Sequence, residues 1–289
     1  MENSKIEWTD HTFNPWWGCM KVSEGCKNCY AETLDSRWKG GHWGPGSSRK
    51  PMSEAYWKQP SKWDKAAARA GVKAKVFCAS MADVFEGHPD TLPHLSRLFN
   101  LIDNTPNLIW QLLTKRPEHI NILSKGHWPN GLPENVWIGT SVENQDTAKK
   151  RVRELLKVNA IIRFLSIEPL LENVNLRFPL LPTDVITANT CCKNPNRNFG
   201  IHWVIVGGES GHNARPLHPD WVRNIREDSD RIGAAFFFKQ WGEWLPVERG
   251  RLYREPSIDF TDGQQMVKVG KRVAGRKLDG IEYNDFPNY

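Results

Sequence analysis

The sequence predicts an α/β fold, a full or partial TIM-like (β/α) barrel with a small C-terminal extension. Three observations predict it. Short apolar runs alternate with helix-like segments, polar residues follow the ends of these runs, and 289 residues of 39% hydrophobic content suffice for one large α/β domain. The mean hydropathy is -0.58 and no run approaches eighteen apolar residues, so we expect no membrane span.

The expected strands are short runs of β-branched, aromatic and aliphatic residues. They lie at 75–80, 108–114, 135–142, 161–167, 202–207 and 234–239, with a first strand within 6–13. The expected helices lie at 30–38, 93–103, 117–123, 144–156 and 219–232, with two short helical pieces in 53–70, the second starting near residue 61 after Pro60. Strand alternating with helix predicts parallel strands and right-handed crossovers. A doubly wound open sheet remains the alternative, because the periodicity of the sequence does not show whether the sheet closes into a barrel.

Polar residues follow the end of nearly every expected strand. They are Ser80, Asp83, Thr114, Lys115, Arg116, Thr140, Ser141, Glu143, Ser166, Glu168, Gly207, Gly208, Glu209, Ser210, Lys239 and Gln240. A barrel keeps its chemistry at the carboxyl ends of its strands. The series therefore predicts a functional mouth there, within a domain that we place at residues 1–244.

The N-terminal loop carries Cys19, Cys26 and Cys29 in a C-x6-C-x2-C arrangement. Gly18 and Gly25 each precede a cysteine, and glycine allows the backbone to approach a bulky group closely. Three thiolates without a nearby fourth suit an iron–sulfur cluster with one open iron. A structural zinc ion wants four ligands, and His11 could supply the fourth. The spacing alone leaves both metals open.

The other cysteines have simpler interpretations. Cys78 lies in an apolar strand and is most simply a core residue. Cys191 and Cys192 fall in a polar stretch that we interpret as an insertion near the mouth. We expect no disulfides. The N-terminus is polar and shows no signal peptide for export to an oxidising compartment, and a chain of this length can be stable without covalent cross-links. A reducing, cytoplasmic compartment is the expected location.

Charge points toward acidic partners. The net charge is +6, the pI is about 9.0, and there are fourteen tryptophans. This balance permits contact with a nucleic acid, and some tryptophans could stack on bases, although packing explains most of them. Residues 245–289 form the most basic region and are expected to be an extension that packs on or near the mouth.

Motifs along nearly the whole chain resemble the phage Gp37/Gp68-type family, a domain of unknown function with a radical S-adenosylmethionine (SAM) signature. The matching stretches are IEWTDHTFNPWWGC, SEGCKNCYAE, ASMADVFE, LLTKRPE, SIEPLL, VGGESG, FFFKQWG and GRKLDG. One departure is the cysteine spacing, since the common radical SAM pattern is C-x3-C-x2-C with an aromatic residue before the last cysteine. Here Asn28 holds that position and Tyr30 follows Cys29.

The resemblance implies an enzyme in which Cys19, Cys26 and Cys29 ligate a [4Fe-4S] cluster and SAM chelates the fourth iron. An external electron donor would reduce the cluster, and a 5′-deoxyadenosyl radical from SAM would abstract hydrogen from the substrate. The substrate is open, with a nucleic acid or nucleotide derivative as the leading hypothesis. The alternatives are a zinc-dependent nucleic-acid-binding protein without enzymatic activity, and a barrel that binds SAM or a cluster without radical chemistry.

Residues at the expected strand ends are the candidates for the SAM pocket. Lys115 is expected to bind the SAM carboxylate, and Asp83 or Glu168 the ammonium or the ribose hydroxyls. Ser80 and Ser141 supply hydroxyls, and Gly207 and Gly208 allow the chain to pass close to a ligand. The remaining candidates are Tyr30 and Glu209.

Overall fold

The computed structural model describes residues 1–177, 200–248 and 253–288. Its centre is a seven-stranded sheet in the order β1-β4-β5-β6-β7-β8-β9, in which each neighbouring pair is parallel. These strands are β1 (His11–Thr12), β4 (Ala74–Cys78), β5 (Leu108–Thr114), β6 (Val136–Ser141), β7 (Ile162–Ile167), β8 (Trp203–Gly207) and β9 (Ala235–Gln240). The order follows the chain without a reversal, as in a partial (β/α) barrel and unlike a doubly wound sheet. The predicted α/β class is confirmed.

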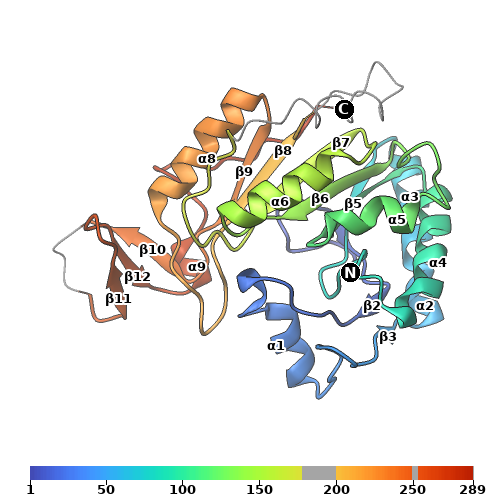
Figure 1. The fold of residues 1–289 in the computed structure, drawn as a ribbon, viewed down its shortest axis with the longest axis horizontal. Coiled ribbons are helices and arrows are strands. Elements are labelled where there is room, and N and C mark those ends of the chain that lie inside the picture. The colour runs from blue at the N-terminus through green and yellow to red at the C-terminus, as the bar shows by residue number, and fades with distance from the viewer. Residues whose placement is uncertain (178–199, 249–252, 289) are drawn as a thin grey trace.

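The helices occupy the segments between the strands (Figure 1). They are α1 (Tyr30–Arg37), α2 (Glu54–Trp57), α3 (Gln59–Ala70), α4 (Leu92–Asp103), α5 (Ile120–Ser124), α6 (Gln145–Leu156), α8 (Pro219–Ile232) and α9 (Lys271–Ala274), with the 3-10 turns η1 (Glu24–Cys26), η2 (Pro89–Thr91) and η3 (Pro117–His119). Pro60 was expected to precede the second helical piece, yet it lies in the first turn of α3. Proline is tolerated there because the first amides of a helix have no intrahelical partner.

Both faces of the large sheet are buried, as a parallel sheet requires. The helix-covered face carries Trp110 and Leu112 of β5, which belong to the main core. Side chains alternate along a strand, so Ile109 points to the other face. There it belongs to a second, largely aromatic cluster, whose members are Trp8, Phe77, Ile109, Trp137, Ile162, Phe164, Trp203, Ile205 and Phe237. This cluster fills the concave side of the partial barrel.

The C-terminal part covers an exposed edge. A bridge joins Phe237 of β9 to Asn284, and the amide of Phe238 donates to the carbonyl of Tyr283 at 3.1 Å. The end of the chain thus lies antiparallel beside β9 and satisfies edge groups that would otherwise be unpaired. Within the described ranges, β9 pairs with β8 and with this segment, and the barrel is open.

Two small antiparallel sheets complete the fold. One contains β10 (Trp244–Val247), β12 (Gln265–Lys268) and β11 (Ser257–Asp259), and it projects at one end of the molecule next to α9 (Figure 1). The other pairs β2 (Trp16–Trp17) with β3 (Lys50–Pro51). In the part of the chain that the structure describes, no helix is long and apolar enough to cross a membrane. Cys191 and Cys192 lie outside the described residues.

Candidate functional site

The three loop cysteines line one cavity of about 450 Å³. Cys26 ends η1, and Cys29 is the N-cap residue of α1. All three are free thiols, as is Cys78, which is fully buried in the main core. The loop therefore directs three potential ligand atoms into a shared space.

The cavity lies at the carboxyl ends of the parallel strands, as the sequence predicted. Its lining includes every expected site residue except Gly207, namely Cys19, Cys26, Cys29, Tyr30, Ser80, Asp83, Lys115, Ser141, Glu168, Gly208 and Glu209. Gly207 ends β8 just behind the lining, where an added Cβ would lie 3.1 Å from the Glu168 carboxylate. At Gly208 a Cβ would meet the Trp241 carbonyl at 1.9 Å, so only glycine fits. Trp8, Phe77 and Leu113 add an apolar surface.

Tyr30 and Ser80 contact each other at the cavity wall. The Tyr30 hydroxyl donates to the Ser80 carbonyl at 2.7 Å, while the tyrosine side chain remains largely exposed. The side-chain amide nitrogen of Asn14 donates to the Ser80 hydroxyl at 3.1 Å. The first residue of α1 is thus attached to the end of β4.

Asp83 forms the first of three carboxylate centres beside the loop. It accepts hydrogen bonds from the Thr114 hydroxyl at 2.6 Å and from the amides of Phe85 and Lys115 at 3.0 and 3.1 Å. Arg116 donates to the same carboxylate at 2.8 Å, and its other terminal nitrogen donates to the Met20 carbonyl at 2.9 Å. Both oxygens of Asp83 therefore have protein partners, and Arg116 ties the residue after Cys19 to β5.

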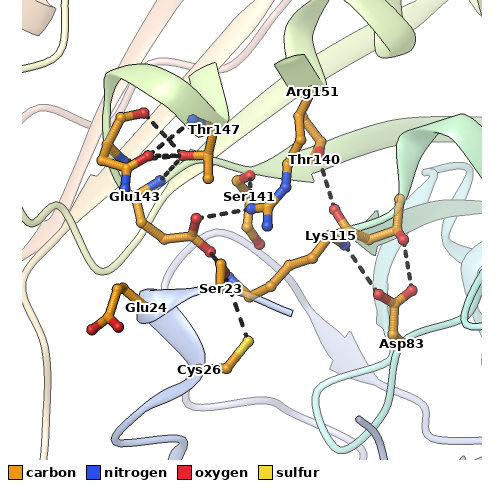
Figure 2. Close-up of polar contacts among 12 residues, drawn as sticks. Ser23, Glu24, Cys26, Asp83, Lys115, Thr140, Ser141, Glu143, Thr147 and Arg151 are labelled. Carbon is orange, nitrogen blue, oxygen red and sulfur yellow. Dashed lines mark hydrogen bonds and ion pairs between the residues drawn. The ribbon is translucent and has the colours of Figure 1, made fainter. Parts of the chain in front are cut away.

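Glu143 forms the second centre, and its side chain is fully buried. Figure 2 shows its polar contacts. Its carboxylate accepts from Lys115, from Arg151 at 2.9 Å and from the Ser23 hydroxyl at 2.9 Å. Figure 2 shows Ser23 between this carboxylate and Cys26, whose sulfur is 3.8 Å from the Ser23 oxygen. Burial alone would raise the pKa of Glu143, but the charges of Lys115 and Arg151 hold it below its ordinary value of 4.5.

Glu209 forms the third centre. It accepts three hydrogen bonds from Arg215, through the main-chain amide at 2.8 Å and the guanidinium at 2.9 and 2.7 Å. Asn28 donates to it at 3.0 Å, and the same nitrogen donates to the Asn213 carbonyl at 2.8 Å. Burial would raise the pKa of Glu209, yet these donors lower it. The residue before Cys29 is thereby joined to the loop after β8.

Glu168 and Gln240 form a further polar pair in the cavity lining, in which the Gln240 side-chain oxygen keeps no protein partner. Lys239 contacts both Glu168 oxygens, at 2.9 and 2.8 Å. The Gln240 nitrogen donates to Glu168 at 2.9 Å and to the Ser210 hydroxyl at 3.0 Å. The Gln240 oxygen is buried and has no partner. A flipped amide would place oxygen against the Glu168 carboxylate, so the contacts favour this orientation. The site thus offers an acceptor for an amino or hydroxyl group.

Two of the cysteine thiols, Cys19 and Cys29, have raised pKa values that favour their protonated form. Burial raises the pKa of Cys19 to about 12, and the nearby charges of Asp83 and Glu86 add to the effect against the opposing charge of Arg116. Burial also raises the pKa of Cys29, although amides of the first turn of α1 favour its thiolate. A metal ligand must be a thiolate, so binding a metal here requires release of these protons.

The donor set fits an iron–sulfur cluster better than zinc. Ligands bound at about 2.3 Å to one tetrahedral zinc ion lie roughly 4 Å apart. Among the described residues, no trio of His, Cys, Asp or Glu side chains that includes these cysteines has all its ligand atoms within 4.8 Å. His11, the expected fourth zinc ligand, stacks on Trp63 instead and is absent from the cavity lining. Thiolates that bind separate irons are more widely spaced.

Several site residues were missing from the expected set although their positions gave a signal. Glu143, Arg116 and Gln240 follow expected strands, so their place at the mouth was visible in the sequence. The roles of Asn28, Arg151 and Arg215 depend on which loops meet. The periodicity of the sequence does not show which loops meet, and only the tertiary structure does.

Solved structures of spore photoproduct lyase are similar to this chain at a low level. The structure complexed with dinucleoside spore photoproduct has a TM-score of 0.46 and 11% identity, and the match covers 92% of this chain and 70% of that chain. A mutant with bound AdoMet and dinucleoside spore photoproduct has a TM-score of 0.45 and 12% identity over the same shares. A likeness this distant does not define the chemistry of this chain. No curated protein matches it.

A family model gives the stronger relationship. The model described as "Protein of unknown function (DUF5131)" matches residues 3–287. It corresponds to the family historically named for phage Gp37/Gp68, which the sequence motifs indicated. Because the match spans nearly the whole chain, this protein belongs to the DUF5131 family.

Proposed function

We propose that the protein is a radical SAM enzyme in which Cys19, Cys26 and Cys29 hold a [4Fe-4S] cluster. One observation carries the proposal: three free thiols from one loop line a single cavity at the carboxyl ends of parallel strands. When bound, the reduced cluster would supply one electron that cleaves SAM into methionine and a 5′-deoxyadenosyl radical, which takes a hydrogen atom from the substrate.

The cavity residues would bind and orient SAM. Gln240 offers an unused acceptor for an ammonium or a ribose hydroxyl, and Glu168, whose side chain is 21% exposed, is proposed to share that role. Lys115 is the proposed partner of the SAM carboxylate, because its ammonium reaches the cavity beside the loop while it contacts Glu143. Ser80 and Ser141 would supply hydroxyl groups. Asp83 is less suited to the ammonium, since its side chain is 7% exposed, against 21% for Glu168, and it already carries the charge of Arg116.

The apolar part of the lining would exclude water. Trp8 and Phe77 belong to the aromatic cluster inside the partial barrel, and Leu113 packs against it. Their surfaces could support a planar adenine ring. A dry cavity also protects a reactive intermediate from unwanted reactions.

A nucleic acid or nucleotide derivative is the proposed substrate class. The net charge of +6 supports it, as do the exposed Lys5 and Lys271 at the cavity rim. Binding to DNA or RNA would then weaken as salt is raised, since phosphate contacts release counterions. Absence of salt-dependent binding to either polymer would remove polymers from the proposal. An external donor would supply the electron.

Anaerobic reconstitution tests the proposed function. Wild-type protein and the Cys78→Ala control should bind iron and sulfide and convert SAM to 5′-deoxyadenosine in the presence of dithionite. Single alanine substitutions of Cys19, Cys26 and Cys29 should abolish both results. Protein that holds one zinc ion and no sulfide would instead support the zinc-binding alternative.

A further inference from the structure

We propose that three buried carboxylates, Asp83, Glu143 and Glu209, are positioning residues that hold one cysteine each and preform the loop before any cofactor binds. The nature of the cofactor rests on the function proposed above, whereas the positioning itself does not.

Each cysteine lies within three residues of a loop residue that one of the carboxylate centres holds. Asp83 holds Arg116, which donates to the carbonyl of Met20, next to Cys19. Glu143 accepts from Ser23, whose oxygen lies 3.8 Å from the Cys26 sulfur. Glu209 accepts from Asn28, next to Cys29. Each cysteine therefore has a neighbour attached to a different carboxylate.

The three carboxylates come from different parts of the strand-end rim. Asp83 follows β4, Glu143 follows β6, and Glu209 follows β8. The loop is therefore attached at three separated points of one rigid sheet, which fixes its position more strongly than a single contact would. Arg215 adds a link from the third point, since its guanidinium donates to the Glu24 carbonyl at 3.1 Å.

Burial makes these attachments hard to break. The exposed fractions of the side chains are 7% for Asp83, 0% for Glu143 and 6% for Glu209. Each carboxylate carries a guanidinium partner, and a buried charge without a partner is unfavourable. The loop groups complete the hydrogen bonding of these ion pairs, so moving the loop would break a hydrogen bond at each of the three centres.

Gly25 shows how closely the loop fits the second centre. A Cβ at this position would lie 2.3 Å from Cγ of Glu143. The loop backbone thus packs directly on the side chain of the carboxylate. A residue whose only role was to support the core would not require such contact with the cysteine loop.

Residue-resolved alkylation of the metal-free, reduced protein tests the proposal. Trypsin cleaves after Lys21, Lys27 and Arg37, so Cys19, Cys26 and Cys29 fall on separate peptides. Iodoacetamide rates can then be read for each by mass spectrometry. The deciding variants are Glu143→Gln and Glu209→Gln. Asp83→Asn is less decisive, because the charge of Asp83 itself raises the pKa of Cys19.

Each deciding variant should release mainly its own cysteine. Glu143→Gln should raise the alkylation rate of Cys26 about fivefold or more, and Glu209→Gln that of Cys29, because each substitution favours local opening of one attachment. Ser23→Ala should reproduce the effect on Cys26 with a milder change. Glu24→Gln is the matched control, since Glu24 lies in the same loop and its side chain is 70% exposed. Its ion pair with Arg215, at 3.7 Å, is exposed and contributes little, so the alkylation rates should stay close to those of wild type.

Cys78 reports global unfolding in the same samples, because it is fully buried in the main core. Equal acceleration of all three loop cysteines, or acceleration only together with Cys78, would overturn the proposal. Wild-type protein that assembles no cluster would refute the proposed function while the alkylation pattern still decided the positioning role.

Discussion

Replacement of Gly25 by alanine is a sharp perturbation of the site. The new Cβ would lie 2.3 Å from Cγ and 2.7 Å from Cδ of Glu143. Carbon atoms in contact normally stay about 3.5–4.0 Å apart, so one side must move by roughly 1 Å. Lys115 and Arg151 hold the buried Glu143, so we expect the loop to move. Overpacking of this kind costs about 1–3 kcal/mol.

The expected result is a lower Tm and a more reactive Cys26. A loss of about 2 kcal/mol in the free energy of unfolding lowers Tm by roughly 4–8 °C in a protein near this size. The Ser23–Glu143 hydrogen bond should weaken too, so alkylation of Cys26 should accelerate.

Gly126→Ala is the matched control, because an added Cβ there meets nothing within 4 Å. Its Tm and Cys26 reactivity should match those of wild type or show slight stabilisation. If Gly25→Ala has the same Tm and the same Cys26 reactivity as Gly126→Ala, the inference that the loop packs closely on Glu143 is wrong.

Three further predictions concern the core, the pH response and the cavity. Cys78→Ser should lower Tm, because it buries a hydroxyl in an apolar core at a cost of about 1–3 kcal/mol, yet leave the iron content unchanged on metal analysis. The carboxylate of Glu143 is stabilised in the folded protein, so its contribution to stability is complete above pH 4.5 and is lost as the pH falls through its lower folded-state pKa. The Tm difference between wild type and Glu143→Gln should therefore shrink below pH 4.5, and a constant difference would contradict the ion network. Gln240→Leu should weaken SAM binding up to about tenfold by calorimetry on the loaded protein, since a hydrogen bond contributes roughly 0.5–1.5 kcal/mol; unchanged affinity would remove Gln240 from the SAM site.

The strands and helices were largely predictable because their signals are local. The run 108–114 is strand β5, and 219–232 is helix α8, with the expected bounds. Expected ends elsewhere differ by a residue or a few, as at β4, which ends at Cys78 rather than at Ser80. The return of the chain end beside β9 was not visible, because pairing with a distant strand leaves no periodic signal.

The composition of the site was more predictable than its internal contacts. Parallel strands bring their carboxyl ends together, so the polar residues after each strand had to share one rim. Whether a carboxylate there meets a ligand or a protein cation depends on tertiary contacts. Asp83 is an example. It follows β4, and the cation that pairs with it, Arg116, follows the neighbouring strand β5, thirty-three positions later in the chain. The sequence placed both residues at strand ends but did not show that they form an ion pair.

Electron paramagnetic resonance of anaerobically reconstituted, dithionite-reduced protein shows whether the three cysteines hold a cluster that SAM reaches. We expect the signal of a reduced [4Fe-4S] cluster that changes when SAM is added, because SAM would bind the iron that no cysteine ligates. The same signal with no change on addition of SAM would contradict the claim that SAM binds an open iron. A sample without any cluster signal, with zinc bound by the three cysteines, would contradict the radical SAM proposal as a whole.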